Sequence, residues 1–122
     1  MRQAEQVGEP SAVEAVRVRD WLHRLLVGWR LDAEVVDDAL LVATELLANV
    51  VEHARTPFRI SVRLRHPLLH VAISDDRVGV PARSLNATAG QVCGLRLVTA
   101  VALRWGWDEH EAGKTVWVEL VV

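Results

Sequence analysis

Two polar residues stand one helical turn apart inside an otherwise apolar stretch of the chain. Glu45 and Asn49 have as neighbours Leu46, Leu47, Ala48, Val50 and Val51. A carboxylate and an amide oxygen at this spacing suit a hard cation such as Mg²⁺, which takes oxygen ligands and keeps several waters. The alternative is the solvated face of an amphipathic helix, because Asp38 and Glu52 extend the same polar stripe at helical spacing.

A second candidate is an aspartate at the end of an apolar stretch, Asp75 after Leu68–Ser74. An aspartate at the point where a buried strand passes into a loop can accept a hydrogen bond from a ligand. Gly79, four residues later, would let the backbone approach that ligand closely. Ordinary turn residues would explain the same pattern.

Two further segments are weaker candidates for ligand binding. Gly94-Leu95 opens a predicted helix, and the free amides of a helix N-terminus suit a phosphate group. Gly113-Lys114-Thr115 joins a turn to the last predicted strand, and a tight turn is the alternative interpretation of its glycine.

The elements that must position these residues begin with two helices. The Ser11 to Glu14 spacing is that of a capping box and predicts a first helix over residues 12–28. A second helix is expected from Asp32 to about Ala54, ending before Pro57. Residues 1–10 are polar and lack periodicity, so they are expected to be a flexible lead-in.

After Pro57 the apolar period changes from helical to alternating, which predicts strands. We expect strands over residues 58–65 and 68–74, a third helix over 94–103, a strand from Trp105 and a final strand over 115–122. Helices and strands are segregated along the chain. The predicted fold is therefore α+β, a two-layer sandwich of about three helices on a mainly antiparallel sheet of four to five strands, with residues 11–122 as one domain.

Composition excludes several classes of protein. The 122 residues are 51% apolar and 25% charged, which is typical of a globular domain, and the net charge of −2 argues against direct nucleic-acid binding. A single cysteine, Cys93, excludes an internal disulfide framework. No stretch reaches the roughly 18 apolar residues of a membrane span and no signal-peptide core follows Met1, so a cytoplasmic location is expected.

The order of the candidate segments resembles that of the four conserved boxes of the Bergerat-type ATPases, the nucleotide-binding domains of histidine kinases, gyrase and Hsp90-like chaperones. The matching segments are Glu45-x3-Asn49-x3-His53, Asp75 with Gly79, Gly94-Leu95 and Gly113-x-Thr115. The chain is most similar to the small stand-alone branch of anti-sigma-factor serine kinases. The run from Thr44 to Asn49, the segment Arg104-Trp105-Gly106 and the ending from Gly113 to Leu120 also fit that branch.

The resemblance implies roles for these residues toward ATP and Mg²⁺. Asn49 would bind the Mg²⁺ that bridges the phosphates, and Glu45 would orient or deprotonate the attacking hydroxyl as a general base. Asp75 would accept a hydrogen bond from the adenine amino group, with Thr115 supporting that contact. Gly79 would line the adenine pocket.

Over the phosphates, Gly94 and Leu95 would close as a lid. Two positions depart from the pattern: Val92 stands where the family's lid usually has its first glycine, and Arg77 stands two positions after the aspartate, where the family usually has a small residue.

The function implied by the resemblance is that of an ATP-binding regulatory protein. It would bind a sigma factor or an anti-sigma-factor antagonist protein, and it would phosphorylate a serine of that antagonist. The alternative is a non-catalytic pseudokinase, a binding module whose ATP lid is degenerate. A homodimer is left open by the sequence.

Overall fold

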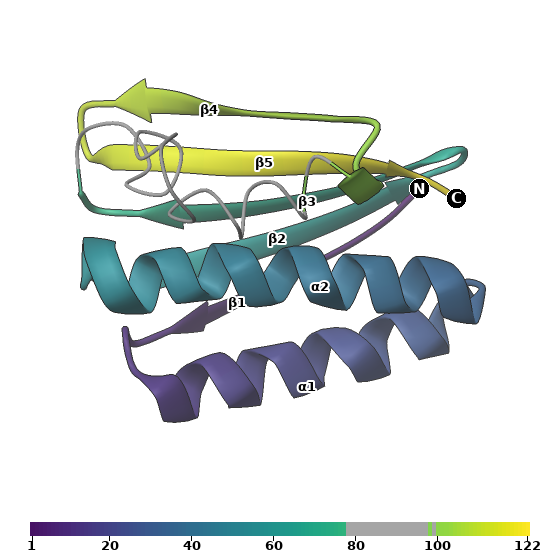
Figure 1. Cartoon of the computed structure of the whole chain (residues 1–122), viewed down its shortest axis with the longest axis horizontal. Helices are drawn as coiled ribbons and strands as arrows, with labels where there is room; N and C mark the ends of the chain where they lie inside the picture. The colour runs from purple at the N-terminus through teal and green to yellow at the C-terminus, as the bar shows by residue number, and fades with distance from the viewer. Residues whose placement is uncertain (78–97, 99) are drawn as a thin grey trace.

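The computed structural model has two layers, a pair of helices and a five-stranded sheet (Figure 1). It describes residues 1–77, 98 and 100–122. The helices are α1 (Ala12–Gly28) and α2 (Ala33–Asn49), and the strands are β1 (Arg2–Gly8), β2 (Phe58–Arg65), β3 (Leu68–Asp75), β4 (Arg104–His110) and β5 (Gly113–Val121). All neighbouring strands pair antiparallel in the order β1-β2-β3-β5-β4. The predicted α+β class and two-layer arrangement are confirmed.

The number of helices differs slightly from the expectation of about three. Within the described part of the chain, α1 and α2 are the two α-helices long enough to form a layer. Most of the helix predicted over residues 94–103 lies outside the described residues. Of its described members, Val98, Ala100 and Val101 are helical.

The prediction of a flexible lead-in over residues 1–10 is wrong for Arg2–Gly8, which form the edge strand β1. This strand pairs with β2 from Arg2 opposite Leu64 to Gly8 opposite Phe58. Edge strands commonly carry polar and charged side chains, so the absence of an apolar pattern did not exclude a strand. At the end of β1, a Cβ on Gly8 would lie 2.5 Å from Cζ of Phe58, so a larger residue there would have to displace the Phe58 ring.

The first helix has the predicted bounds. The hydroxyl of Ser11 accepts a hydrogen bond from the backbone N–H of Glu14 (3.2 Å), which satisfies one of the free amides at the start of α1. Val18, Leu22 and Leu26 follow at intervals of four residues and are fully buried. They attach α1 to α2, because residues at this spacing lie on one face of a helix.

The second helix buries side chains in two directions, because it packs both on α1 and on the sheet. Its buried residues are Val36, Ala39, Leu40, Val42, Ala43, Leu46, Leu47 and Asn49. The helix ends earlier than predicted: Val50–Ala54 form a wider, π-helical turn, in which the N–H of Arg55 reaches the carbonyl of Val50 at 2.7 Å. Arg55 then leaves the helix with a left-handed backbone (φ 56°).

The register between β3 and β5 fixes which side chains share a face. Ser74 is opposite Thr115, and Asp75 is opposite Lys114. Because successive residues of a strand point to opposite faces, Asp75 and Lys114 lie on the same face as the buried Ile73. Ser74 and Thr115 lie on the face turned away from the helices.

Gly113 allows β5 to start directly against the end of β3. Its φ is +150°, and a Cβ at this position would lie 1.9 Å from the backbone oxygen of Asp75. We expect Gly113→Ala to lower the free energy of unfolding by more than about 2 kcal/mol, because both the backbone conformation and the space require glycine.

Gly28→Ala is the matched control, since a Cβ there would meet nothing within 4 Å. It should leave the free energy of unfolding unchanged or raise it by up to about 1 kcal/mol. Chemical denaturation of the two variants and the unmodified protein tests the pair. Equal stabilities of the two variants would contradict the close approach of Gly113 to Asp75.

The face turned away from the helices carries a charged and aromatic cluster. His70 stacks on Trp117 with ring centroids 5.9 Å apart, and its Nδ1 lies 3.2 Å from Oε2 of Glu119. The guanidinium of Arg104 donates a hydrogen bond to the other carboxylate oxygen of Glu119. This hydrogen bond is the main cause that holds the pKa of Glu119 below its ordinary value, and His70 lowers it further.

A lowered pKa in the folded state means that the charged Glu119 stabilises the fold. This contribution is fully present above the carboxyl's ordinary pKa and is lost as the pH falls through the lowered value. We expect Glu119→Gln to reduce stability at neutral pH and to flatten the loss of stability on acidification. Urea midpoints measured from neutral pH downward test this, and parallel curves for the variant and the unmodified protein would contradict it.

Candidate functional site

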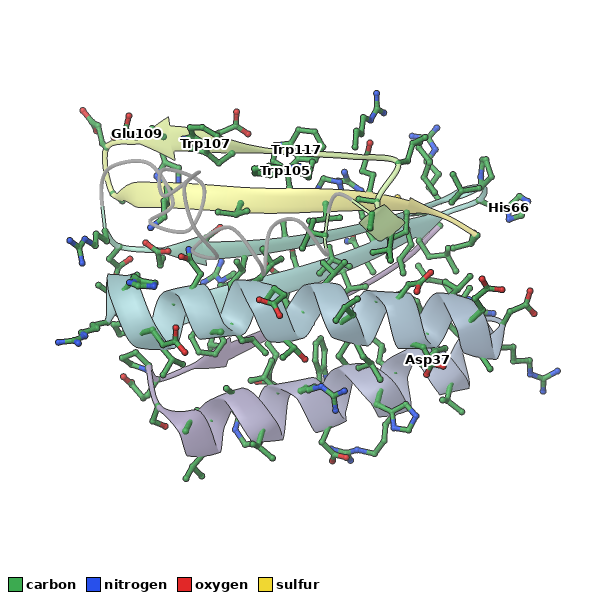
Figure 2. The ribbon with its side chains drawn as sticks, viewed as in Figure 1. Asp37, His66, Trp105, Trp107, Glu109 and Trp117 are labelled. Carbon is green, nitrogen blue, oxygen red and sulfur yellow. The ribbon has the colours of Figure 1, made fainter. Side chains whose placement is uncertain are left out.

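Within the described residues, the three buried polar or charged side chains are those of Asn49, Asp75 and Lys114. Asn49 ends α2, Asp75 ends β3 and Lys114 follows the first residue of β5. Figure 1 shows the end of α2, the end of β3 and the start of β5 at the same end of the molecule. In Figure 2, Glu109 of β4 marks this end and His66, in the turn between β2 and β3, marks the opposite end.

Asn49 continues a buried stripe of α2 that Ala39, Val42 and Leu46 begin. Its side chain is 6% exposed, and its Oδ1 has no hydrogen-bond partner among the described residues. A buried acceptor without a partner costs about 1–3 kcal/mol. An amide oxygen left unpaired in this way fits the oxygen donors that Mg²⁺ prefers.

The surface interpretation of the polar stripe on α2 therefore does not hold at Asn49. Burial rises along the stripe from the half-buried Asp38 and Glu45 to the buried Asn49, and Glu52 beyond them is exposed. Glu45 lies one turn before Asn49, on the same side of the helix. The structure thus brings these two predicted site residues together.

Asp75 and Lys114 form an ion pair in the interior. Nζ of Lys114 lies 3.1 Å from Oδ1 and 3.0 Å from Oδ2 of Asp75. The side chain of Lys114 is 4% exposed and that of Asp75 is 1% exposed. Oδ1 also accepts the backbone N–H of Arg77 (2.9 Å). The strand register produces this pair, because it sets the two residues opposite each other on the core face.

The segment after β3 is tied to the segment after α2. The guanidinium of Arg77 donates a hydrogen bond to the carbonyl of His53 in the π-helical turn. The N–H of Asp76 donates to Oγ1 of Thr56 (3.0 Å). These bonds hold the end of β3 beside the end of α2, so Arg77, which departs from the family pattern, has a structural role here.

Thr115 is placed differently from the other predicted site residues. Its hydroxyl lies 2.8 Å from Oγ of Ser74, and Nε2 of His110 lies 3.3 Å from it. These contacts are on the sheet face opposite to Asp75. The structure therefore brings Lys114 to Asp75, and it does not bring the side chain of Thr115 there.

The remaining predicted site residues, Gly79, Gly94 and Leu95, lie outside the described residues, as does Val92. A cavity of about 580 Å³ opens at the same end of the sheet, and Ser74, Asp75 and Asp76 are among the residues that line it. Asn49 and Glu45 are not among its described lining residues.

The sequence singled out Glu45, Asn49 and Asp75 as candidate site residues, but it did not reveal that Lys114 pairs with Asp75 or that Arg77 contacts His53. A signal for Lys114 was available: it is the only lysine of the chain, and it stands at the start of a strand whose alternate residues are apolar. Counting the alternation back from Val116 places Lys114 on the core face. A cation on that face requires a buried anion as its partner.

None of the helices that the structure describes has the length and the apolar character needed to cross a membrane. In the same part of the chain, no three His, Cys, Asp or Glu side chains lie close enough together to hold a metal ion as a group.

The buried pair should show strong energetic coupling in unfolding experiments. Lys114→Met should lower the free energy of unfolding by about 3–5 kcal/mol, because it leaves a buried carboxylate without its counter-ion. The double variant Lys114→Met/Asp75→Asn should be more stable than the sum of the single changes predicts. Additive effects in denaturant titrations of the four proteins would mean that the two side chains do not interact.

Comparison with known proteins agrees with this arrangement. The sequence model of the family described as histidine kinase-like ATPase domain matches residues 9–120. A chain of the SiaB–SiaC complex from Pseudomonas aeruginosa is similar in structure, with a TM-score of 0.72 at 11% identity over 98% of this chain and 88% of that one.

A second similar structure is the histidine kinase domain of the blue-light activated histidine kinase from Erythrobacter litoralis EL346. Its TM-score is 0.52 at 19% identity, over 71% of this chain and 44% of that one. At such identities the two structures show a shared fold. No curated protein sequence matches the chain. Because the family model covers nearly all of its residues, the chain belongs to the histidine kinase-like ATPase domain family.

Proposed function

We propose that this protein binds Mg²⁺-ATP and a protein partner, and that it phosphorylates a serine of an antagonist protein. The observation that carries the nucleotide-binding part is the buried Asn49, whose Oδ1 has no described partner. Membership of a family of ATPase domains gives a reason for burying this amide at a cost in stability. The oxygen of the Asn49 amide would be a ligand of the metal that accompanies ATP.

Bound Mg²⁺-ATP would supply the phosphoryl group and the charge neutralisation that phosphoryl transfer needs. Asn49 would hold the metal through Oδ1. Glu45, one helical turn earlier, would orient the hydroxyl of the protein substrate and accept its proton at a carboxylate oxygen. The rigid packing of α2 on two sides supports this assignment, because transfer depends on fixed positions.

The adenine end of the nucleotide is assigned to Asp75. Its carboxylate is held in place by Lys114 and by the N–H of Arg77, so its orientation is set before a ligand arrives. We propose Gly79 as a lining residue of the same pocket and Gly94 and Leu95 as the lid. These three assignments rest on the family resemblance.

The proposal of a protein partner has support from the structural comparison. The similar chain from Pseudomonas aeruginosa was solved in a complex of two proteins. A sigma factor or its antagonist is the partner proposed here, on the resemblance to anti-sigma-factor kinases. The net charge of −2 disfavours nucleic acid as the direct partner.

A non-catalytic binding module is the second candidate function. The observation that favours it is the position of Val92, where the resemblance leads us to expect a glycine of the lid. A β-branched residue does not easily adopt the positive φ that glycine allows. In this case the protein would bind its partner, with or without ATP, and transfer no phosphate.

Asn49→Ala should remove the Mg²⁺-dependent part of ATP affinity. The fold should survive, because the removed oxygen has no described partner to lose. Calorimetric titration with ATP, in Mg²⁺ and in EDTA, measures this. Asp37→Ala is the matched control, since Asp37 is an exposed acidic residue toward the other end of α2 (Figure 2). If both variants keep the same Mg²⁺ effect, Asn49 is not the metal ligand.

Glu45→Gln should separate binding from transfer. The amide keeps the size of the side chain but cannot take a proton, so transfer to a serine should fall by about 10²–10⁴-fold while ATP affinity stays close to that of the unmodified protein. Single-turnover transfer of labelled phosphate to the antagonist tests the step. Equal rates would exclude Glu45 as the base. Retained ATP binding without any transfer by the unmodified protein would support the binding module.

A further inference from the structure

The carbonyl of His53, in the π-helical turn after α2, cannot receive the usual donor from its own helix. In an α-helix this carbonyl would accept from the amide four residues later, and that residue is Pro57, which has no N–H. The next residue, Phe58, already begins β2. Carbonyls of a last helical turn need donors from elsewhere. The guanidinium of Arg77 supplies one to His53.

Arg77 makes this contact from a backbone that is fixed at the end of β3. Its N–H donates to Oδ1 of Asp75 (2.9 Å), and the N–H of its neighbour Asp76 donates to Oγ1 of Thr56 (3.0 Å). Arg77 therefore bonds to the end of β3 with its main chain and to the turn after α2 with its side chain. A cation is favoured at the second place, because the C-terminal end of a helix carries partial negative charge.

The turn that Arg77 contacts starts directly after Asn49. It spans Val50–Ala54, and its wider winding is closed by the N–H of Arg55, which donates to the carbonyl of Val50. π-helical turns are frequent at functional sites. A change in their winding would alter the course of the backbone next to Asn49, whose Oδ1 is the buried acceptor without a described partner.

We propose that Arg77 is a positioning residue for the metal ligand Asn49: its bond to the carbonyl of His53 keeps the π-helical turn in the form that presents Oδ1 of Asn49 to Mg²⁺. This inference rests on the proposed binding of Mg²⁺-ATP. It goes beyond the attachment of two segments, because it requires an effect on metal-dependent affinity. It also gives a function to a position where the family resemblance leads us to expect a small residue.

The Mg²⁺ effect, defined as the ratio of the ATP dissociation constant in EDTA to that in Mg²⁺, tests the inference. Arg77→Ala removes the guanidinium but keeps the N–H that bonds to Asp75. The Mg²⁺ effect should fall by about tenfold, a shift that one hydrogen bond with a charged donor can produce. The dissociation constant in EDTA should change by less than about twofold, because Asp75 keeps its bonds to Lys114 and to the N–H of residue 77.

Arg55→Ala is the matched control. Arg55 is exposed like Arg77, and its Nε also donates to a carbonyl of this turn, that of Glu52 (3.3 Å), but the two residues are only three positions apart. Its Mg²⁺ effect should stay within about twofold of that of the unmodified protein. Arg77→Lys should recover part of the loss, since an ammonium group can donate to the same carbonyl. A purely structural role would lower the stability of Arg77→Ala to urea and leave its Mg²⁺ effect unchanged, which would overturn the inference.

The double variant Asn49→Ala/Arg77→Ala shows whether the effect passes through Asn49. When Asn49 is already alanine, Arg77→Ala should cause no further loss of the Mg²⁺ effect, because the ligand that it positions is gone. Independent losses from the two changes would contradict the inference.

The outcomes also separate this inference from the proposed function. A Mg²⁺ effect that is lost in Asn49→Ala but kept in Arg77→Ala contradicts the inference alone, and the proposed metal ligand stands. If the unmodified protein binds ATP equally well in Mg²⁺ and in EDTA, or binds no ATP, the proposed function fails and the inference falls with it.

Discussion

The pairing register of β3 and β5 is the constraint on which the site depends. It places Asp75 against Lys114 on the core face and Ser74 against Thr115 on the other face. A slip of one residue would exchange the two faces, because side chains alternate along a strand. The apolar residues on either side of the pair, Ile73 and Val116, hold the register through their own burial. Gly113 completes it, since only a residue without a side chain fits against the carbonyl of Asp75.

The interior of this small domain is therefore not uniformly apolar. At one end, the apolar packing gives way to a charged pair and to an amide oxygen, Oδ1 of Asn49, that has no partner among the described residues, while the rest of the described core is hydrocarbon. Such groups weaken a fold unless other interactions compensate for them. Lys114 neutralises the buried charge of Asp75. The hydrogen bonds from Arg77 and Asp76 attach the segment after β3 to the segment after α2. Asn49 has no described compensation, and departures of this kind from good packing are expected at functional positions.

The sequence predicted most of the architecture, because the apolar periods are long and clear. The bounds of α1 and the strand at Phe58–Arg65 agree with the structure, since each has a strict helical or alternating pattern. β1 could not be recognised in this way, because an edge strand is held by backbone hydrogen bonds to β2, and its side chains need no pattern. Pairing across strands was equally hidden: the partner of Asp75 is 39 residues away along the chain, and only the register identifies it.

Lys114 is also the only lysine that the chain contains, and it is closed off from water. The exposed cations of the described surface are arginines and histidines, which amine-directed reagents do not modify. Among the side chains of this sequence, amine-directed acylating reagents therefore have one target, and it is reached only when the core opens. Since a free amine is needed for reaction, the rate of labelling at Lys114 reports how often this end of the domain opens. The chain carries an internal probe of its own opening, with no engineered label.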